Sequence, residues 1–273
     1  MGRKLFCEIN PVCFQISEKK EILKRGIQDL YSKDLIARKY EFNKLAETVK
    51  SHSSIIVRRL YGVDIKLQEN KATNLELACG RISGILIKPG EIFSFWELVG
   101  NPTARKGYKP GLNIRKGKPV SGIGGGLCQL ANMIHYLVLH SSMEITEIHH
   151  HSDALFPDER RRVPFGTGTS ICYNYKDYRF KNNTDQNVQI LVWCENGELH
   201  GELRSTEQFP FSYELVEENA HFHKEGTKYY RISKVFRIIT DKISGDTTGK
   251  ELILSNHSEV LYDYSMIPIE EIR

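Results

Sequence analysis

The sequence predicts an α+β fold with N-terminal helices, a central glycine-rich turn followed by a helix, and antiparallel β-hairpins in the C-terminal half. Three observations carry this prediction. They are apolar residues at helical spacing near the N-terminus, four glycines within 122–126, and the turn signal Asn196-Gly197 between two strand-like segments. The chain has 273 residues, of which 40% are hydrophobic and 26% are charged, so its composition is typical of globular rather than disordered proteins.

The N-terminal segment 17–60 is expected to be helical. Ser17 can cap a helix, and apolar residues recur after it at helical spacing: Ile22, Leu23, Ile27, Leu30 and Tyr31. A less regular apolar run follows in 45–56. Residues 17–60 hold eleven Lys or Arg against six Asp or Glu. That excess fits either an anionic partner such as a membrane surface or a solvated helical face, and the solvated face is the favoured interpretation.

The central part of the chain predicts two helices separated by turns and short strands. From about residue 72 the pattern changes, and the segment that begins NLELACGRI predicts a helix. Pro89-Gly90 predicts a turn, and the aromatic segment after it predicts a strand. Residues 103–119 are basic and contain several glycines, which is typical of loops and short strands. Residues 127–140 predict a helix because a single apolar stripe runs along them: Leu127, Leu130, Ile134, Leu137 and Val138.

The last third of the chain predicts antiparallel strands. They are expected at 171–175, 178–181, 188–194, 198–203, 228–239 and 250–254. The last two form a hairpin that we expect to lie apart from the main domain. The chain is therefore divided into a helical region (1–70), a core domain (71–205) and a C-terminal hairpin extension (206–273).

Charge and cysteine spacing exclude several function classes. A net charge of +4 is too weak for a dedicated nucleic-acid binder. No stretch approaches the roughly 18 apolar residues of a membrane-spanning helix. Glu8, Asn10 and Pro11 interrupt any apolar signal core, so a cytoplasmic location is expected. The six cysteines form no C-x-x-C pair, so neither a zinc site nor a disulfide scaffold is expected, and no cofactor is expected.

The glycine-rich turn is the first feature that could carry chemistry. Gly124, Gly125 and Gly126 let the backbone approach a ligand closely, and free N–H groups at a helix start attract anions. The turn fits neither a Walker motif nor a dinucleotide fingerprint. The alternative is a tight structural turn that lets a buried helix begin.

Cys128 follows this turn, in the first turn of the expected helix. Amide dipoles at that position lower the pKa of a thiol, and the histidines at 149–151 follow the same helix, so a nucleophile–base pair is conceivable. The alternative is a small thiol packed under the turn, with histidines that serve no chemistry. The histidines at 149–151 and 221–223 lack carboxylate or cysteine partners at a metal-binding spacing, so no metal site is expected.

Glu91 is the most suggestive carboxylate, because it precedes Phe93, Phe95 and Trp96. A carboxyl group that aromatic neighbours desolvate can act as a general acid, whereas an exposed turn glutamate does no chemistry. Glu97 is a second carboxylate nearby in sequence, but spacing alone does not set the distance between the two carboxyl groups.

Five sequence blocks, taken together, resemble the VanW family. They are PGEIFSFWELVG at 89–100, GY at 107–108, GGGLCQ at 124–129, HHHS at 149–152 and DYRFKNNT at 177–184. The family is named for an accessory protein of glycopeptide (vancomycin) resistance clusters in Gram-positive bacteria. The resemblance covers about 70–205, and the rest of the chain looks like the VanW-proper branch rather than the longer exported relatives.

The resemblance implies a role at the cell wall, with peptidoglycan or its precursors as partner. Three classes stay open. The first, which we favour, is an enzyme similar to lytic transglycosylases with Glu91 as general acid. The second is a thiol enzyme on stem peptides, with Cys128 as nucleophile and His151 as base, and the third is a non-enzymatic binding module. The expected substrate-binding residues are Tyr108, Gly124, Gly125, Gly126, Gln129 and Asn182. We expect Glu91, the glycine turn, Cys128 and His151 to line one concave surface.

The chain also departs from the family pattern. Gly168, Thr169 and Ser170 stand where the family commonly shows Asp-Ala-Thr, so an acid that relatives carry there is missing. Ala131-Asn132 replace frequent Ser or Thr, and Trp96 replaces a frequent asparagine. An enzyme that cleaves peptidoglycan works outside the membrane, which conflicts with the expected cytoplasmic location unless the substrate is a cytoplasmic precursor.

Overall fold

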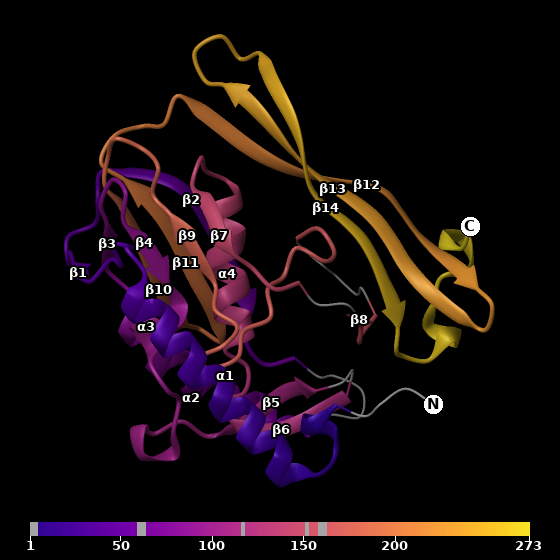
Figure 1. Cartoon of the computed structure of the whole chain (residues 1–273). Coiled ribbons are helices and arrows are strands. Elements are labelled where there is room, and N and C mark those ends of the chain that lie inside the picture. Colours follow the sequence, from indigo (N-terminus) through magenta and orange to yellow (C-terminus); the bar gives the residue numbers. More distant parts are fainter. Residues whose placement is uncertain (1–4, 59–63, 116–117, 151–152, 158–162) are drawn as a thin grey trace.

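The computed structural model in Figure 1 describes residues 5–58, 64–115, 118–150, 153–157 and 163–273. The helices are α1 (Pro11–Tyr31), α2 (Ile65–Ile82), α3 (Phe95–Val99) and α4 (Cys128–Leu139), with 3₁₀ turns η1 (Phe6–Glu8), η2 (Ala104–Lys106), η3 (Tyr264–Met266) and η4 (Ile269–Glu271). The strands are β1 (Lys39–Tyr40), β2 (Glu47–Ile55), β3 (Ile85–Ile87), β4 (Ile92–Ser94), β5 (Pro110–Arg115), β6 (Lys118–Ile123), β7 (Glu144–Glu147), β8 (Asp153–Ala154), β9 (Arg179–Lys181), β10 (Val188–Glu195), β11 (Glu198–Ser205), β12 (Phe211–Glu225), β13 (Lys228–Asp241) and β14 (Thr247–Val260). Helices together with mostly antiparallel strands confirm the α+β prediction. None of the described helices is long and apolar enough to cross a membrane.

A five-stranded antiparallel sheet, in the order β1-β3-β10-β11-β2, forms one wall of the main core. Its inner face carries buried apolar side chains and packs against α2 and α4. α4 packs tightly on Gly201 of β11, where an added Cβ would lie 2.9 Å from Met133 Cγ and 3.0 Å from Leu137 Cδ1. The absence of a side chain at Gly201 therefore sets how closely helix and sheet pack.

A three-stranded antiparallel sheet, in the order β4-β9-β7, carries the aromatic part of the core. Phe93 of β4 stacks on Phe180 of β9, with ring centroids 4.9 Å apart, and Tyr178 is fully buried beside them. Ser94 ends β4 and caps α3, because its Oγ accepts the N–H of Glu97 at 3.3 Å. The strand predicted after the Pro89-Gly90 turn is thereby confirmed as β4.

The C-terminal part forms a separate four-stranded sheet, β12-β13-β14-β8, whose long strands extend away from the main core (Figure 1). β8 comes from the middle of the chain and pairs with β14 in parallel. A small second core gathers where β8 meets the sheet, with the buried residues Ala154, Phe165, Phe222, Val260 and Ile267. Arg237 of β13 also donates to the carbonyl of Ser141, just after α4, at 2.9 Å. The sheet thus contacts the rest of the fold at identifiable points.

Several local predictions are confirmed. The helix expected at 127–140 is α4, and the helix expected in the segment that begins NLELACGRI is the second half of α2. β10 and β11 form the hairpin expected around Asn196-Gly197, with Glu195 opposite Glu198. The second hairpin is β13 and β14. These segments were readable because their apolar period or turn chemistry is local.

The helical prediction for 17–60 is confirmed only as far as Tyr31, where α1 ends. It is wrong beyond that point, because 32–46 contains no helix and 47–55 forms the edge strand β2, while residues 59–60 lie outside the described residues. β2 pairs with β11 along its whole length, and this long-range pairing overrides a weak helical pattern. α1 also begins earlier than Ser17: Asn10 caps it by accepting the N–H of Cys13 at 2.9 Å, and Pro11 occupies the first helical position. The strand expected at 171–175 is wrong too, because Cys172 and Lys176 close a tight turn there.

The boundary expected at residue 70 runs through one sheet. β1 and β2 lie before it, yet they pair with β3 and β11, which lie after it. Whether 1–70, 71–205 and 206–273 fold as units stays a prediction.

The close packing at Gly201 can be tested by substitution. We expect Gly201→Val to lower the free energy of unfolding by roughly 1–3 kcal/mol, because the new side chain collides with Met133 and Leu137. Urea denaturation measures this change. Gly80→Ala in α2 is the matched control, because a Cβ there meets nothing within 4 Å. It should raise stability by about 0.5–1 kcal/mol. A Gly201→Val protein as stable as the parent would contradict the packing described.

Candidate functional site

The glycine turn before α4 packs against its own chain. An added Cβ on Gly125 would lie 2.2 Å from the carbonyl carbon of Gly111 in β5, and one on Gly126 would lie 2.2 Å from Lys71 Cγ in α2. Asn74 of α2 donates to the carbonyl of Gly125 at 2.9 Å. Gly124 and Gly126 have φ angles of 74° and 96°, which favour glycine. The close approach that these glycines permit is made by α2 and β5, and a substrate-binding role stays a prediction.

Cys128 is a free thiol at the first position of α4. Its Sγ lies 4.0 Å from the carbonyl oxygen of Ile171. Burial raises the pKa of the Cys128 thiol, which is opposite to the lowering expected from the helix N-terminus. The sulfur is therefore held as a thiol rather than a thiolate at neutral pH. His151, the expected base, lies outside the described residues.

Gln129, Asn182 and Tyr108 hold parts of the frame together. Gln129 Nε2 donates to Ser54 Oγ at 2.9 Å and to the carbonyl of Ile55 at 3.0 Å, which fastens α4 to β2. Asn182 is fully buried, and its Nδ2 donates to the carbonyls of Ile87 and Gln186. Tyr108 belongs to the main core, where burial raises its pKa. Their expected contact with substrate stays a prediction.

Glu91 occupies the turn that joins β3 to β4 and is half-buried. Its Oε2 accepts the N–H of Lys88 at 2.9 Å, which fixes the carboxylate. Main-chain bonds on both sides of Glu91 run to Asn182: Gly90 N–H donates to the Asn182 carbonyl at 2.7 Å, and Asn182 N–H donates to the Glu91 carbonyl at 2.9 Å. The glycine turn is held by α2 and β5 instead, so Glu91 and that turn are anchored by different parts of the fold.

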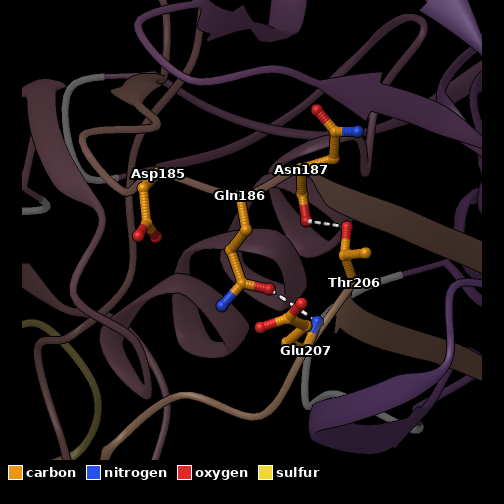
Figure 2. A pocket seen from close by; sticks show the side chains of 5 residues that line it. All are labelled: Asp185, Gln186, Asn187, Thr206 and Glu207. Atoms are coloured by element: carbon orange, nitrogen blue, oxygen red, sulfur yellow. Dashed lines mark hydrogen bonds between the residues drawn. The ribbon is translucent and has the colours of Figure 1, made fainter.

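A polar hollow of about 340 Å³ is lined by the loop that follows Asn182 in the chain and by the segment just after β11 (Figure 2). It is lined by Asp185, Gln186, Asn187, Thr206 and Glu207. Gln186 reaches across it, and its Oε1 accepts the N–H of Glu207 at 2.6 Å. Because Asn182 holds both Glu91 and the carbonyl of Gln186, one buried asparagine links the Glu91 turn to the wall of this hollow.

A buried ionic network lies at the start of β9, and sequence analysis did not find it. Asp177 is fully buried and accepts hydrogen bonds from Ser94 Oγ, from the N–H groups of Trp96 and Tyr178, and from Arg179 Nε. The Arg179 bond is 2.8 Å long. Asp177 and Arg179 both belong to the DYRFKNNT block. Their spacing of two residues places both side chains on one face of an extended chain, and this spacing is the sequence signal that could have indicated the network.

The network extends to α1 and β7. Arg25 of α1 binds the carboxylate of Glu147 through both terminal nitrogens, and Asp29 accepts from Arg179 at 2.9 Å. Burial disfavours ionisation of Glu147, but hydrogen bonds from Arg25, His149 and the Asp177 amide outweigh it and lower its pKa to about 2. Glu147 is therefore ionised at neutral pH and serves as an anchor for α1.

A second hollow, of about 300 Å³, lies on the outer face of the five-stranded sheet. It is lined by residues 51–53 and 200–202 and by Trp193. The Trp193 ring stacks on His200, with centroids 5.2 Å apart and planes 11° apart. Lys44 lies over the Trp193 ring and pairs with Glu202. A flat aromatic surface bordered by charged and hydroxyl groups suits a ligand with one apolar face and a polar rim.

Comparison with known proteins places these features in a family. The family model described as VanW like protein matches residues 70–204. The chain is 31% identical over 201 residues to the vancomycin B-type resistance protein VanW of Enterococcus faecalis (strain ATCC 700802 / V583), covering 74% of this chain and 73% of that protein. The chain belongs to the VanW family. That family is linked to vancomycin resistance, as the resemblance of the five sequence blocks implied.

A second protein is similar to this chain over a shorter part of its length. The uncharacterized protein YoaR of Bacillus subtilis (strain 168) is 30% identical over 131 residues, which is 48% of this chain and 42% of YoaR. No solved structure matches the chain significantly. Glu91, Cys128 and Asp177 fall inside the VanW match, whereas Arg25 and Asp29 of α1 lie outside it. Among the described residues, no group of three or more His, Cys, Asp or Glu side chains is arranged to hold a metal ion.

The anchoring role of Glu147 predicts a dependence of stability on pH. Its pKa falls from 4.5 to about 2 on folding, so its stabilising effect is complete above pH 4.5 and is lost as the pH falls through about 2. We expect the loss of this Glu147 contribution to lower the free energy of unfolding by up to roughly 3 kcal/mol across this window. Urea denaturation between pH 2 and 7 measures the change.

Two variants separate this contribution of Glu147 from general acid denaturation. Glu147→Gln should be less stable at pH 7 and should lose less stability between pH 4.5 and 2. Glu144→Gln, on the exposed side of the same strand, should keep the slope of the parent. Equal slopes in all three proteins would show that Glu147 does not anchor α1.

Proposed function

We propose that this chain acts on the glycan strands of peptidoglycan, with Glu91 as the general acid of a reaction of the lytic transglycosylase type. The link of the VanW family to vancomycin resistance supports the cell wall as the place of action. The choice of Glu91 rests on which partners the carboxylates of the family blocks have in the structure.

Glu91 differs from the other acidic groups in how it is held. Asp177 is buried against Arg179, and the Oε2 of Glu97 pairs with Arg38 at 2.9 Å. Both carboxylates are thus engaged by an arginine of the fold. Glu91 is half-buried and bonded through Oε2 to a neutral main-chain amide. This difference is the observation that carries the proposal, because a general acid must be able to reach the atom that it protonates, and no ion pair among the described residues engages Glu91.

The proposed reaction needs a single acid. Glu91 donates its proton to the glycosidic oxygen as the bond to the anomeric carbon breaks. A hydroxyl of the same sugar attacks that carbon and forms an anhydro ring, and its proton returns to the Glu91 carboxylate. No water is consumed, and the carboxyl group is restored. The polar hollow lined by the loop after Asn182, with its amide, hydroxyl and carboxylate groups, could hold sugar hydroxyls near this turn.

A non-enzymatic binding module is the second candidate, and the Trp193 hollow favours it. Sugar rings have an apolar face and a polar rim, which match the Trp193–His200 stack and its border of Lys44, Glu202 and serine side chains. A binding role for this surface requires no reaction, and its two rings lie opposite each other on paired strands.

The general-acid proposal predicts the effect of one substitution. Glu91→Gln keeps the size of the side chain but cannot donate a proton, so turnover of purified peptidoglycan should fall by roughly a hundredfold or more. Mass spectrometry of the released muropeptides measures this, and anhydro ends identify the reaction. Glu97→Gln is the matched control and should keep the activity of the parent.

Cys128 separates this proposal from the thiol enzyme. Cys128→Ala should leave turnover nearly unchanged, although loss of the buried sulfur should cost about 1 kcal/mol of stability or more. The thiol enzyme would instead be supported if the parent hydrolyses stem peptides and the Cys128→Ala protein is inactive. An active Glu91→Gln protein would rule out Glu91 as the acid.

The binding candidate makes its own prediction. Trp193→Ala should weaken calorimetric binding of soluble muropeptides by roughly tenfold or more, because the aromatic surface is lost. Leu252→Ala, at a side chain 55% exposed on the C-terminal sheet, is the control and should bind as the parent does. If the parent binds muropeptides but releases no anhydro product, the binding module becomes the supported function. Equal affinity of Trp193→Ala and parent would exclude this hollow as the binding surface.

A further inference from the structure

α1 turns its polar side toward the protein and its apolar side toward solvent. None of its 21 residues is buried. The side chains that are half-buried against the body include Glu18, Glu21, Arg25 and Asp29, of which Arg25 and Asp29 bind the ionic network. A helix of a globular protein ordinarily buries its apolar stripe instead. Only Cys13, Phe14 and Ile22 add apolar area to this half-buried side, so the ion pairs of Arg25 and Asp29 are the main contacts that orient α1.

The outward side of α1 carries a continuous apolar stripe. Its members recur at intervals of three, four or seven residues, which places them on one helix face: Val12, Ile16, Leu23, Ile27 and Leu30. Leu23 is 66% exposed and Leu30 is 79% exposed. Phe6 and Ile9, just before the helix, are exposed as well. A stripe of this length on the surface is typical of a helix that binds a partner.

The charge of this face identifies the partner. The exposed ionic residues of α1 are Lys19, Lys20 and Lys24, whereas its acidic residues lie on the half-buried side. The outward face is thus apolar and basic. Lysine stems can lie along an apolar surface while their ammonium groups reach anionic groups beside it.

We propose that α1 docks this protein onto an anionic lipid surface, with the helix lying flat in the interface. An apolar stripe flanked by lysines is the composition of interfacial amphipathic helices. A helix of this length lies along roughly 30 Å of the surface. A second copy of the chain fits less well, because a two-fold pairing through this face would oppose the lysine rows of the two helices. The proposal does not depend on the enzymatic role of Glu91.

Vesicle sedimentation tests the proposal with the full chain. The parent should bind phosphatidylglycerol vesicles at least tenfold more strongly than phosphatidylcholine vesicles, and added salt should weaken the binding. Leu23→Gln/Ile27→Gln removes apolar contact, and Lys19→Glu/Lys20→Glu reverses the charge. Each double variant should reduce binding to phosphatidylglycerol vesicles at least tenfold. Unchanged urea denaturation curves should accompany the loss, because the substituted side chains are exposed.

The control replaces exposed isoleucines elsewhere. Ile243→Gln/Ile269→Gln changes side chains that are 93% and 84% exposed on the C-terminal part, and it should bind as the parent does. The proposal is overturned if the parent does not bind phosphatidylglycerol vesicles, or if the α1 variants bind these vesicles as strongly as the control does. It is also overturned if sedimentation velocity shows a dimer that Leu23→Gln/Ile27→Gln dissociates, because the stripe is then covered by a second copy.

Discussion

The buried carboxylate of Asp177 holds together segments that are far apart in the chain. Its oxygens receive the Ser94 hydroxyl and Trp96 amide at the start of α3, and the Tyr178 amide and Arg179 side chain at β9. A buried charge is tolerated only when its partners satisfy it, and losing one partner of such a pair costs roughly 3–5 kcal/mol. The position of α1 depends on the same charges, because Arg25 and Asp29 bind what surrounds Asp177. The network is thus the junction between the VanW core and the N-terminal helix.

Several other residues of the family blocks also bond to their own chain. Gln129 fastens α4 to β2, and the glycine turn packs against α2 and β5. Asn182 joins the turn between β3 and β4 to the loop between β9 and β10. A sequence motif can therefore characterise a family because its residues hold the fold together rather than because they take part in a reaction. Glu91 is half-buried, and its carboxylate accepts a hydrogen bond from one main-chain amide. The polar hollow is lined in part by the loop that Asn182 joins to the Glu91 turn.

The sequence predicted what depends on local pattern. The stripe of α4 and the Asn196-Gly197 hairpin follow from the period and the turn chemistry of a few residues, and both are confirmed. It did not predict β2, whose strand state comes from pairing with β11, nor the ionic network, in which Arg25 meets Glu147 across 122 positions. Trp193 and His200 become a platform only because they sit opposite each other on neighbouring strands. For the site, the sequence located the family blocks, but it did not predict that burial raises the pKa of the Cys128 thiol.

The pairing of β2 with β11 also bears on how the chain is made. Ser53 lies opposite His200, so more than half of the chain is synthesised between one strand and its partner. Until β11 emerges from the ribosome, the edge of β2 has no partner strand, and closing so long a loop is slow. An unpaired strand of nine residues is a site for association with other chains. Newly made chains of this protein should therefore need protection by chaperones until the last third has been synthesised.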